Sequence, residues 1–369
     1  IFPQQKDFAI RTFGLPGGAG FLGVCFGRVV TANSPASQGA VPANWQSVLW
    51  HEFCHVVTLS KTRNKMPRWL SEGISVYEEV QANPAWGQSM TPEYRQMILD
   101  GGLTPVSKLS GAFLRPPTPV HLEFAYYESS LVVEYLVEQH GLETLKRILV
   151  ELGAGTPINE ALTHHVGATE QLDAQFEKFA RRRAHDLAPD VDWDEVELPR
   201  GATTDVLAAW LKEHPHNYSG LQRYAMQLIK EEDWHEAKQP LETMRALYPN
   251  DTRANNALSL LAIVHHKLGN PASERNALEQ LAQIDADAVD VCLRLAELAT
   301  NESDWPAVLT NAERALAVNP LIKTPHQQLA QAAEELGNAD RAIHAYEALL
   351  KLDPFDLAGT HYRLARQLR

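Results

Sequence analysis

The chain has 369 residues, of which 44% are hydrophobic and 21% charged, an ordinary globular composition with enough length for two or three domains. Its 33 basic and 46 acidic side chains give a net charge of −13, and no basic tract suits a phosphate backbone, so we expect no nucleic-acid partner. No apolar run approaches the roughly 20 residues that cross a bilayer. The cysteines are too few and too scattered for a disulfide framework or a C-x-x-C metal site: Cys25, Cys54 and Cys292.

The chain opens at Ile1 without a starting methionine or a signal peptide, and we interpret it as a processed chain or a fragment. Its few cysteines suit a reducing compartment or a cysteine-poor periplasmic protein. The sequence leaves both compartments open.

The N-terminal region, residues 1–43, combines several glycines with apolar residues that favour β-strands. The clearest strand is predicted at residues 27–31, with the sequence Gly-Arg-Val-Val-Thr. The glycine-rich run at 17–20 lacks the Gly-Lys-Ser/Thr that completes a phosphate-binding loop, so we do not assign it that function.

Two helices are predicted next. Residues 45–59 contain neither glycine nor proline and indicate a largely buried helix with Asn44 as its N-cap. After a short basic connection, residues 67–79 indicate a second helix, with Pro67 near its first turn.

The first of these helices contains the pattern H-E-x-x-H. Residues four apart share a helix face, so His51 and His55 can point at one metal ion. Glu52 lies beside that face and can reach a water bound to the metal. Cys54 points to a different face, so we expect it to pack in the interior rather than to bind the ion.

Glu72, on the second helix, is the natural third ligand. Two antiparallel helices joined by a short turn can bring it opposite the two histidines. Two histidines, one carboxylate and an open fourth position are typical of a catalytic zinc rather than a structural one. A solvated carboxylate is the alternative, and the surrounding Trp-Leu-Ser-Glu-Gly sequence favours the ligand. We therefore expect one catalytic Zn²⁺.

The H-E-x-x-H block and the Trp-Leu-Ser-Glu-Gly run at 69–73, with Tyr77 behind it, resemble the gluzincin metallopeptidases, specifically the bacterial peptidase-MA-like group. The resemblance continues over residues 125–141, where that group has a helix carrying a tyrosine that faces the metal. Alignment places Tyr126 at this position, with Tyr127 as the alternative.

The resemblance implies hydrolysis of an amide bond by a water that zinc activates, with His51, His55 and Glu72 as the ligands. Glu52 would take the proton as general base and return it to the leaving amine. The hydroxyl of Tyr126 would donate to the oxyanion.

The resemblance also implies a small sheet above the active-site helix, whose edge strand pairs with the substrate backbone. We assign residues 21–32 to that role. The glycine-rich stretch lacks an acidic residue that could hold a substrate's free amine, as gluzincin aminopeptidases do. This favours an endopeptidase or a peptidase of unusual specificity.

The remainder of the first domain is expected to be helical after one insertion. Residues 84–120 are rich in proline and glycine and predict a loop-rich insertion that forms one wall of the cleft. The acidic segment 189–199, with two prolines, predicts the domain boundary. Four helices are expected between them: 124–140, 142–152, 157–166 and 169–186.

Beyond residue 203 the sequence repeats itself. Glu-Glu-Asp-Trp at 231–234 has its counterpart in Glu-Ser-Asp-Trp at 302–305, and Leu-Gly-Asn at 268–270 returns at 336–338. A period of about 34 residues, with Gly-Asn between helices and Pro at the end, resembles tetratricopeptide repeats. We expect four repeats and a capping helix: 216–250, 252–286, 287–320, 321–354 and 356–369.

Arrays of this kind curve into a superhelix whose concave face usually binds an extended peptide or another protein. We expect this face to recognise a substrate or a partner. The alternative is that the array only braces the peptidase or forms a dimer.

Together these features predict an α+β metallopeptidase domain, with a small N-terminal sheet plus helices, followed by an all-α tetratricopeptide-repeat superhelix. The predicted domains are 1–190, a linker with a leading helix at 191–215, and the repeats at 216–369. The expected function is zinc-dependent hydrolysis of peptide bonds in a peptide or protein substrate. The alternatives are an interaction scaffold with a degenerate or conditionally active peptidase domain, and a zinc hydrolase of a non-peptide amide.

Overall fold

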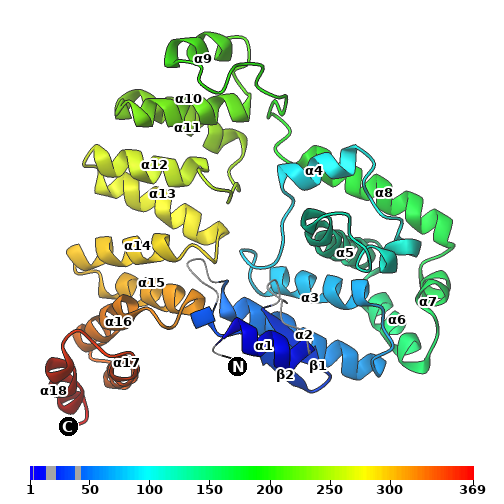
Figure 1. The fold of residues 1–369 in the computed structure, drawn as a ribbon, viewed down its shortest axis with the longest axis horizontal. Helices are drawn as coiled ribbons and strands as arrows, with labels where there is room; N and C mark the ends of the chain where they lie inside the picture. Colours follow the sequence, from blue (N-terminus) through cyan, green and yellow to red (C-terminus); the bar gives the residue numbers. More distant parts are fainter. Residues whose placement is uncertain (3, 14–21, 38–42) are drawn as a thin grey trace. The chain divides into compact units, whose positions relative to one another are not determined.

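The computed structural model describes residues 1–2, 4–13, 22–37 and 43–369. These form two compact units, Ile1–Leu187 and Ala188–Arg369 (Figure 1). The first unit combines helices with a two-stranded sheet, and the second consists of paired helices. Neither unit contains a described helix with the length and apolarity needed to cross a membrane. The glycine run at 17–20 and residue 21 of the expected edge segment lie outside the described residues.

A β-hairpin follows the first helix, α1 (Gln5–Phe13). Strand β1 (Gly23–Phe26) pairs antiparallel with β2 (Val29–Ala32). The small sheet is therefore present, but the strand predicted at 27–31 begins two residues too early. Gly27 has a φ of +67°, which suits glycine and a tight turn, so the chain reverses before β2 begins.

The two predicted metal-site helices are α2 (Trp45–Thr62) and α3 (Arg68–Ala82). The Asn44 side chain accepts hydrogen bonds from two backbone N–H groups in the first turn of α2, as its prediction as the N-cap requires. Pro67 directly precedes α3. Both helices continue about one turn beyond the predicted ends, and they pack against each other.

The insertion at 84–120 is less irregular than predicted. It contains α4 (Pro92–Leu99) and the 3₁₀ helix η2 (Val106–Gly111). Thr91 accepts a hydrogen bond from the backbone N–H of Tyr94, and Tyr94 is buried. Proline is favourable at the first position of a helix, as at Pro92. The high proline content of this segment therefore predicts more loop than the structure contains.

Four further helices complete the first unit, and α3 packs against the longest of them. That helix begins at Pro119 rather than at residue 124, because Thr118 caps it. The core lies among these helices and includes the fully buried Trp69 and Leu136. The four helices are α5 (Pro119–His140), α6 (Leu142–Ala154), α7 (Ile158–His165) and α8 (Thr169–Asp186).

The second unit begins with α9 (Thr204–Leu211) and continues with four helix pairs, one within each predicted repeat, each pair joined by a tight turn (Figure 1). A single helix, α18 (Leu357–Gln367), ends the array. The paired helices are α10 (Tyr218–Lys230), α11 (Trp234–Leu247), α12 (Ala257–Lys267), α13 (Pro271–Ile284), α14 (Val289–Asn301), α15 (Trp305–Val318), α16 (Lys323–Glu335) and α17 (Ala339–Lys351).

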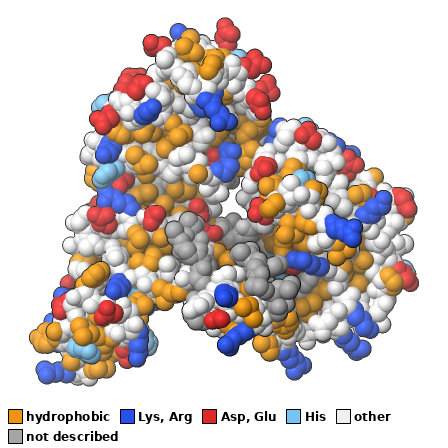
Figure 2. Space-filling model, in the orientation of Figure 1, with side chains coloured by type: hydrophobic (Ala, Val, Ile, Leu, Met, Phe, Trp, Pro, Cys, Tyr) orange, Lys and Arg blue, Asp and Glu red, His pale blue; other side chains and the backbone are white. Residues whose placement is uncertain are grey.

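Acidic and basic side chains are interspersed on the face of the molecule that Figure 2 shows. Among the residues coloured there, neither charge forms a continuous tract on either unit.

Candidate metal and catalytic site

The structure brings the three predicted metal ligands together. The Nε2 atoms of His51 and His55 lie 3.3 and 3.2 Å from Oε2 of Glu72. One ligand atom from each residue lies within 4.8 Å of the other two, and within the described parts of the chain no other group of three His, Cys, Asp or Glu side chains is arranged in this way. Helices α2 and α3 supply the whole set.

The opposite ring nitrogens of both histidines are held by α3. Nδ1 of His51 lies 2.6 Å from Oε1 of Glu79. Nδ1 of His55 lies 2.9 Å from the hydroxyl oxygen of Ser71 and 3.2 Å from that of Ser75. Nδ1–H of a neutral imidazole can donate to these oxygens, which leaves the lone pair of Nε2 for a cation.

Sequence reasoning missed Ser71, Ser75 and Glu79 as site residues. A signal was present, because polar side chains recur every four residues on a helix whose neighbouring positions are largely apolar. Residues at this spacing share one face, and that face of α3 packs against α2. A buried polar stripe opposite the H-E-x-x-H helix is what fixes the histidine rings.

The electrostatics of the cluster favour positive charge. Burial disfavours protonated His51, but hydrogen bonds to Glu72 and Glu79 outweigh it and raise the pKa of His51 to about 10. Burial acts to raise the pKa of Glu72, but hydrogen bonds to His51 and His55 lower it below its usual range. The carboxylates therefore stabilise a cation between them, whether it is a proton or a metal ion.

Glu52 lies on a neighbouring face of α2 and is only 6% exposed. Its Oε2 atom is buried and has no hydrogen-bond partner among the described residues. Burial raises the pKa of Glu52, and the nearby His51 and His55 partly counteract this. A carboxylate with a raised pKa and an unused oxygen is suited to taking up and releasing a proton.

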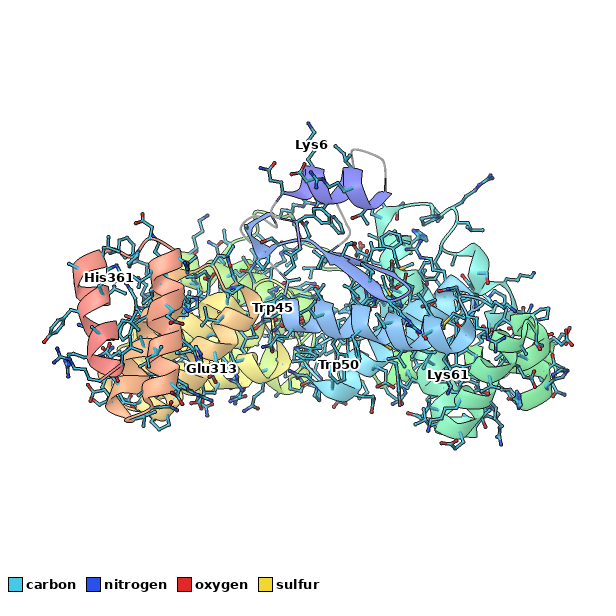
Figure 3. The ribbon with its side chains drawn as sticks, turned by 90° about the horizontal axis from the view of Figure 1, so that it is seen from below. Lys6, Trp45, Trp50, Lys61, Glu313 and His361 are labelled. Carbon is cyan, nitrogen blue, oxygen red and sulfur yellow. The ribbon has the colours of Figure 1, made fainter. Side chains whose placement is uncertain are left out.

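The hairpin packs directly on α2 at Glu52. A Cβ atom added to Gly23 would come within 2.7 Å of Cγ and Oε1 of Glu52, so a larger residue at this position would displace the Glu52 side chain. In Figure 3, the hairpin lies on one side of α2 and Trp50 is labelled on the other. The part of the expected edge segment that is described therefore lies over the candidate base.

Tyr126 lies beside the candidate ligand group of His51, His55 and Glu72. Its hydroxyl oxygen accepts a hydrogen bond of 2.7 Å from Nη2 of Arg68, and Nε of the same arginine donates to Oε1 of Glu72 at 3.2 Å. Burial, together with the charge of Glu72, raises the pKa of Tyr126 to about 12, while Arg68 opposes the shift. The phenol therefore keeps its proton and can donate it in a hydrogen bond.

The alternative tyrosine occupies a different environment. Tyr127 is 5% exposed and stacks on Tyr94 with ring centroids 5.0 Å apart, within the core of the first unit. Cys54 packs against the same core, and burial raises the pKa of its thiol to about 11. Cys54 does not belong to the group of ligand atoms formed by the two histidines and Glu72.

Comparisons with known proteins match both units. The Peptidase MA superfamily model matches residues 27–181, and a tetratricopeptide-repeat model matches residues 325–356. No curated protein matches the chain. The chain therefore carries a Peptidase MA superfamily domain, which points to a peptidase, and a tetratricopeptide repeat, which points to protein–protein interaction.

The similar solved structures include one of MamA, with 17% identity, 41% of this chain and 86% of that chain covered, and a TM-score of 0.33. They also include TTC0263, a thermophilic TPR protein in Thermus thermophilus. For that structure the identity is 17%, the coverage is 54% of this chain and 96% of that chain, and the TM-score is 0.27.

Proposed function

We propose that the chain is a zinc-dependent endopeptidase of the gluzincin type. The observation that carries the proposal is the convergence of Nε2 of His51, Nε2 of His55 and Oε2 of Glu72 beside a buried oxygen of Glu52 that has no hydrogen-bond partner among the described residues. The match of residues 27–181 to the Peptidase MA superfamily supports it.

The donor set fits zinc. Two imidazole nitrogens and one carboxylate oxygen leave the fourth position of a tetrahedral site open, and the Nδ1 partners of both rings set the required tautomer. Bound zinc would supply a Lewis acid that polarises a carbonyl group and lowers the pKa of a water. His51, His55 and Glu72 are the residues that would hold it.

The other site residues have separate tasks in this proposal. Glu52 takes a proton from the attacking water and gives it to the leaving amine. Tyr126 donates a hydrogen bond to the carbonyl oxygen as that oxygen becomes negative. The edge of the hairpin offers backbone groups to an extended substrate, and an extended chain laid along it passes over Glu52.

A second part of the proposal concerns the repeat unit, to which we assign protein binding. Its helix pairs and the repeat match at 325–356 support a role in protein interaction. We propose that the array binds the protein that is to be cut, or a partner that delivers it.

The test is cleavage profiling by mass spectrometry on a diverse mixture of peptides and unfolded proteins. Wild-type protein is compared with Glu52→Gln, after the zinc content of both has been measured. Glu143→Gln, a substitution on an exposed part of the same unit, serves as the matched control. We expect Glu52→Gln to retain zinc and to lose at least roughly 1000-fold in hydrolysis.

Cuts made by wild type and Glu143→Gln, and absent with Glu52→Gln, would establish a peptidase and reveal its side-chain preference. Identical cleavage by all three proteins would remove Glu52 as the base. No cleavage by zinc-loaded wild type would favour the scaffold or the hydrolase of a non-peptide amide.

A further inference from the structure

Arg68, the first residue of α3, connects two parts of the site that otherwise lie on separate helices. Its Nε donates to Oε1 of Glu72 at 3.2 Å, and its Nη2 donates to the hydroxyl oxygen of Tyr126 at 2.7 Å. Nε–H and one Nη2–H leave the planar guanidinium along the same edge, as nearly parallel donors. The carboxylate oxygen of Glu72 and the phenolic oxygen of Tyr126 are therefore held next to each other.

The guanidinium group is also held by aromatic rings. Its central carbon lies 5.1 Å from the ring centroid of Phe113 and 5.8 Å from that of Tyr126. Phe113 is 6% exposed and meets Tyr126 edge-on, with centroids 5.2 Å apart. Because a guanidinium stacks on rings while its edge donates, arginine suits this position and lysine does not.

This arrangement determines what the Tyr126 proton can do. A phenol has one proton to donate, and its oxygen already accepts from Arg68. Among the described residues the Tyr126 hydroxyl donates to no protein acceptor, and Oε1 of Glu72 accepts from Nε–H of Arg68 instead. The hydroxyl proton is therefore left to donate to a group in the cleft.

We propose that Arg68 is a positioning residue for the oxyanion. It directs the Tyr126 proton away from Glu72 and towards the carbonyl oxygen that becomes negative. This inference rests on the proposed peptidase function and assigns Arg68 a role within it.

The experiment is a double-mutant cycle on the zinc-loaded full chain, with Arg68→Gln, Tyr126→Phe and the double variant. Two quantities are measured for each protein: kcat/KM on a peptide identified by the cleavage profiling, and calorimetric affinity for a phosphinic peptide of the same sequence. The phosphinate carries a tetrahedral anionic centre and reports on the oxyanion contact without turnover.

We expect Tyr126→Phe to lower kcat/KM roughly 100-fold and Arg68→Gln roughly 10- to 100-fold. The double variant should match Tyr126→Phe within about threefold, because Arg68 acts through the tyrosine. Phosphinate affinity should follow the same pattern. Arg68→Lys should recover little, and Arg147→Gln, at an exposed arginine of the same unit, should leave both readouts unchanged.

Effects of Arg68→Gln and Tyr126→Phe that multiply in the double variant would overturn the inference while leaving the peptidase intact. Release of zinc from Arg68→Gln under mild chelation would also overturn it, because the role would then be support of Glu72 alone. If zinc-loaded wild type neither cleaves peptides nor binds phosphinic peptides, the proposed function fails and takes this inference with it.

Discussion

The two units differ in whether an arginine lies next to their buried carboxylates. In the repeat unit, Asp251 is 2% exposed and lies 2.7 Å from Nε of Arg253. Glu274 is 4% exposed and lies 2.6 Å from Nε of Arg294. Each of these two charges is neutralised by an arginine where it is buried.

In the first unit, Glu52, Glu79 and Glu128 are as deeply buried. Within the described part of that unit, none of the three forms an ion pair with lysine or arginine. Glu79 faces His51, and Glu52 and Glu128 each keep one oxygen without a hydrogen-bond partner among the described residues.

This difference distinguishes carboxylates that stabilise the fold from carboxylates that can take part in chemistry. Burying a carboxylate without a compensating cation is costly, so a fold retains one chiefly where the charge or the proton is used. The paired carboxylates of the repeat unit suit a binding scaffold. Glu52 and Glu79, which lie near His51 and His55 and form no ion pair with a described lysine or arginine, suit a site that takes up a cation and moves a proton.

The largest expected effect comes from removing Glu72, the proposed third ligand. Glu72→Ala should lower zinc affinity at least roughly 1000-fold, because three ligands share a binding free energy of roughly 10–16 kcal/mol. Competition with a fluorescent chelator measures the affinity. Glu274→Ala, in the repeat unit, should leave it unchanged, and equal zinc affinity in wild type and Glu72→Ala would exclude Glu72 as a ligand.

Glu128 tests whether an unpaired buried carboxylate in the first unit weakens the fold. Glu128 accepts a 2.6 Å hydrogen bond from the backbone N–H of Thr104, and burial raises its pKa to about 8. The folded state therefore binds a proton that the unfolded state releases above about pH 4.5. The stability that this proton contributes is present at low pH and is lost as the pH rises towards 8.

Glu128→Gln mimics the neutral form at every pH. Its free energy of unfolding, relative to wild type, should therefore rise by about 4 kcal/mol between pH 5 and pH 8.5. Hydrogen exchange of the first unit at several pH values measures the difference, and exchange in the repeat unit is the internal control. A difference that does not change with pH would show that Glu128 ionises normally.

The spacing of residues in the sequence was enough to predict one side of the candidate site and the helix pairs of the repeat unit. The four-residue spacing of His51 and His55 places both rings on one helix face, and Asn44 marks where that helix begins, so the α2 side of the cluster could be located from the sequence. The repeat period located the helix pairs in the same way. In both cases a local rule with a fixed periodicity determines the structure.

Contacts between residues on different helices or strands could not be predicted from such spacing. Arg68 and Tyr126 are 58 positions apart and meet because α3 packs on α5. The close contact of Gly23 with Glu52 requires the hairpin to fold over α2. Tertiary packing sets such contacts, and nothing in the neighbouring sequence of either residue encodes them.

A substitution of Glu274 tests whether a buried carboxylate that is paired with arginine stabilises the repeat unit. Glu274 connects α13 to α14 through Arg294 and also lies 3.2 Å from Nδ1 of His266. Glu274→Ala leaves the arginine without its buried partner, so we expect a loss of about 2 kcal/mol in the stability of that unit. Urea denaturation measures it. Unchanged peptide cleavage alongside the lost stability would assign this carboxylate to structure alone.

The smallest expected effect concerns Glu79, which is buried like Glu274 but faces a histidine of the site. In Glu79→Gln the amide oxygen still accepts from Nδ1–H of His51, so the zinc-free fold should change by less than about 1 kcal/mol. The lost negative charge makes the imidazole a weaker ligand, and zinc affinity should fall roughly 10- to 100-fold. Glu78→Gln, on the adjacent face of α3, is the matched control. If Glu79→Gln instead destabilises the fold as much as Glu274→Ala and leaves zinc affinity within about twofold, the two units bury their carboxylates for the same structural reason.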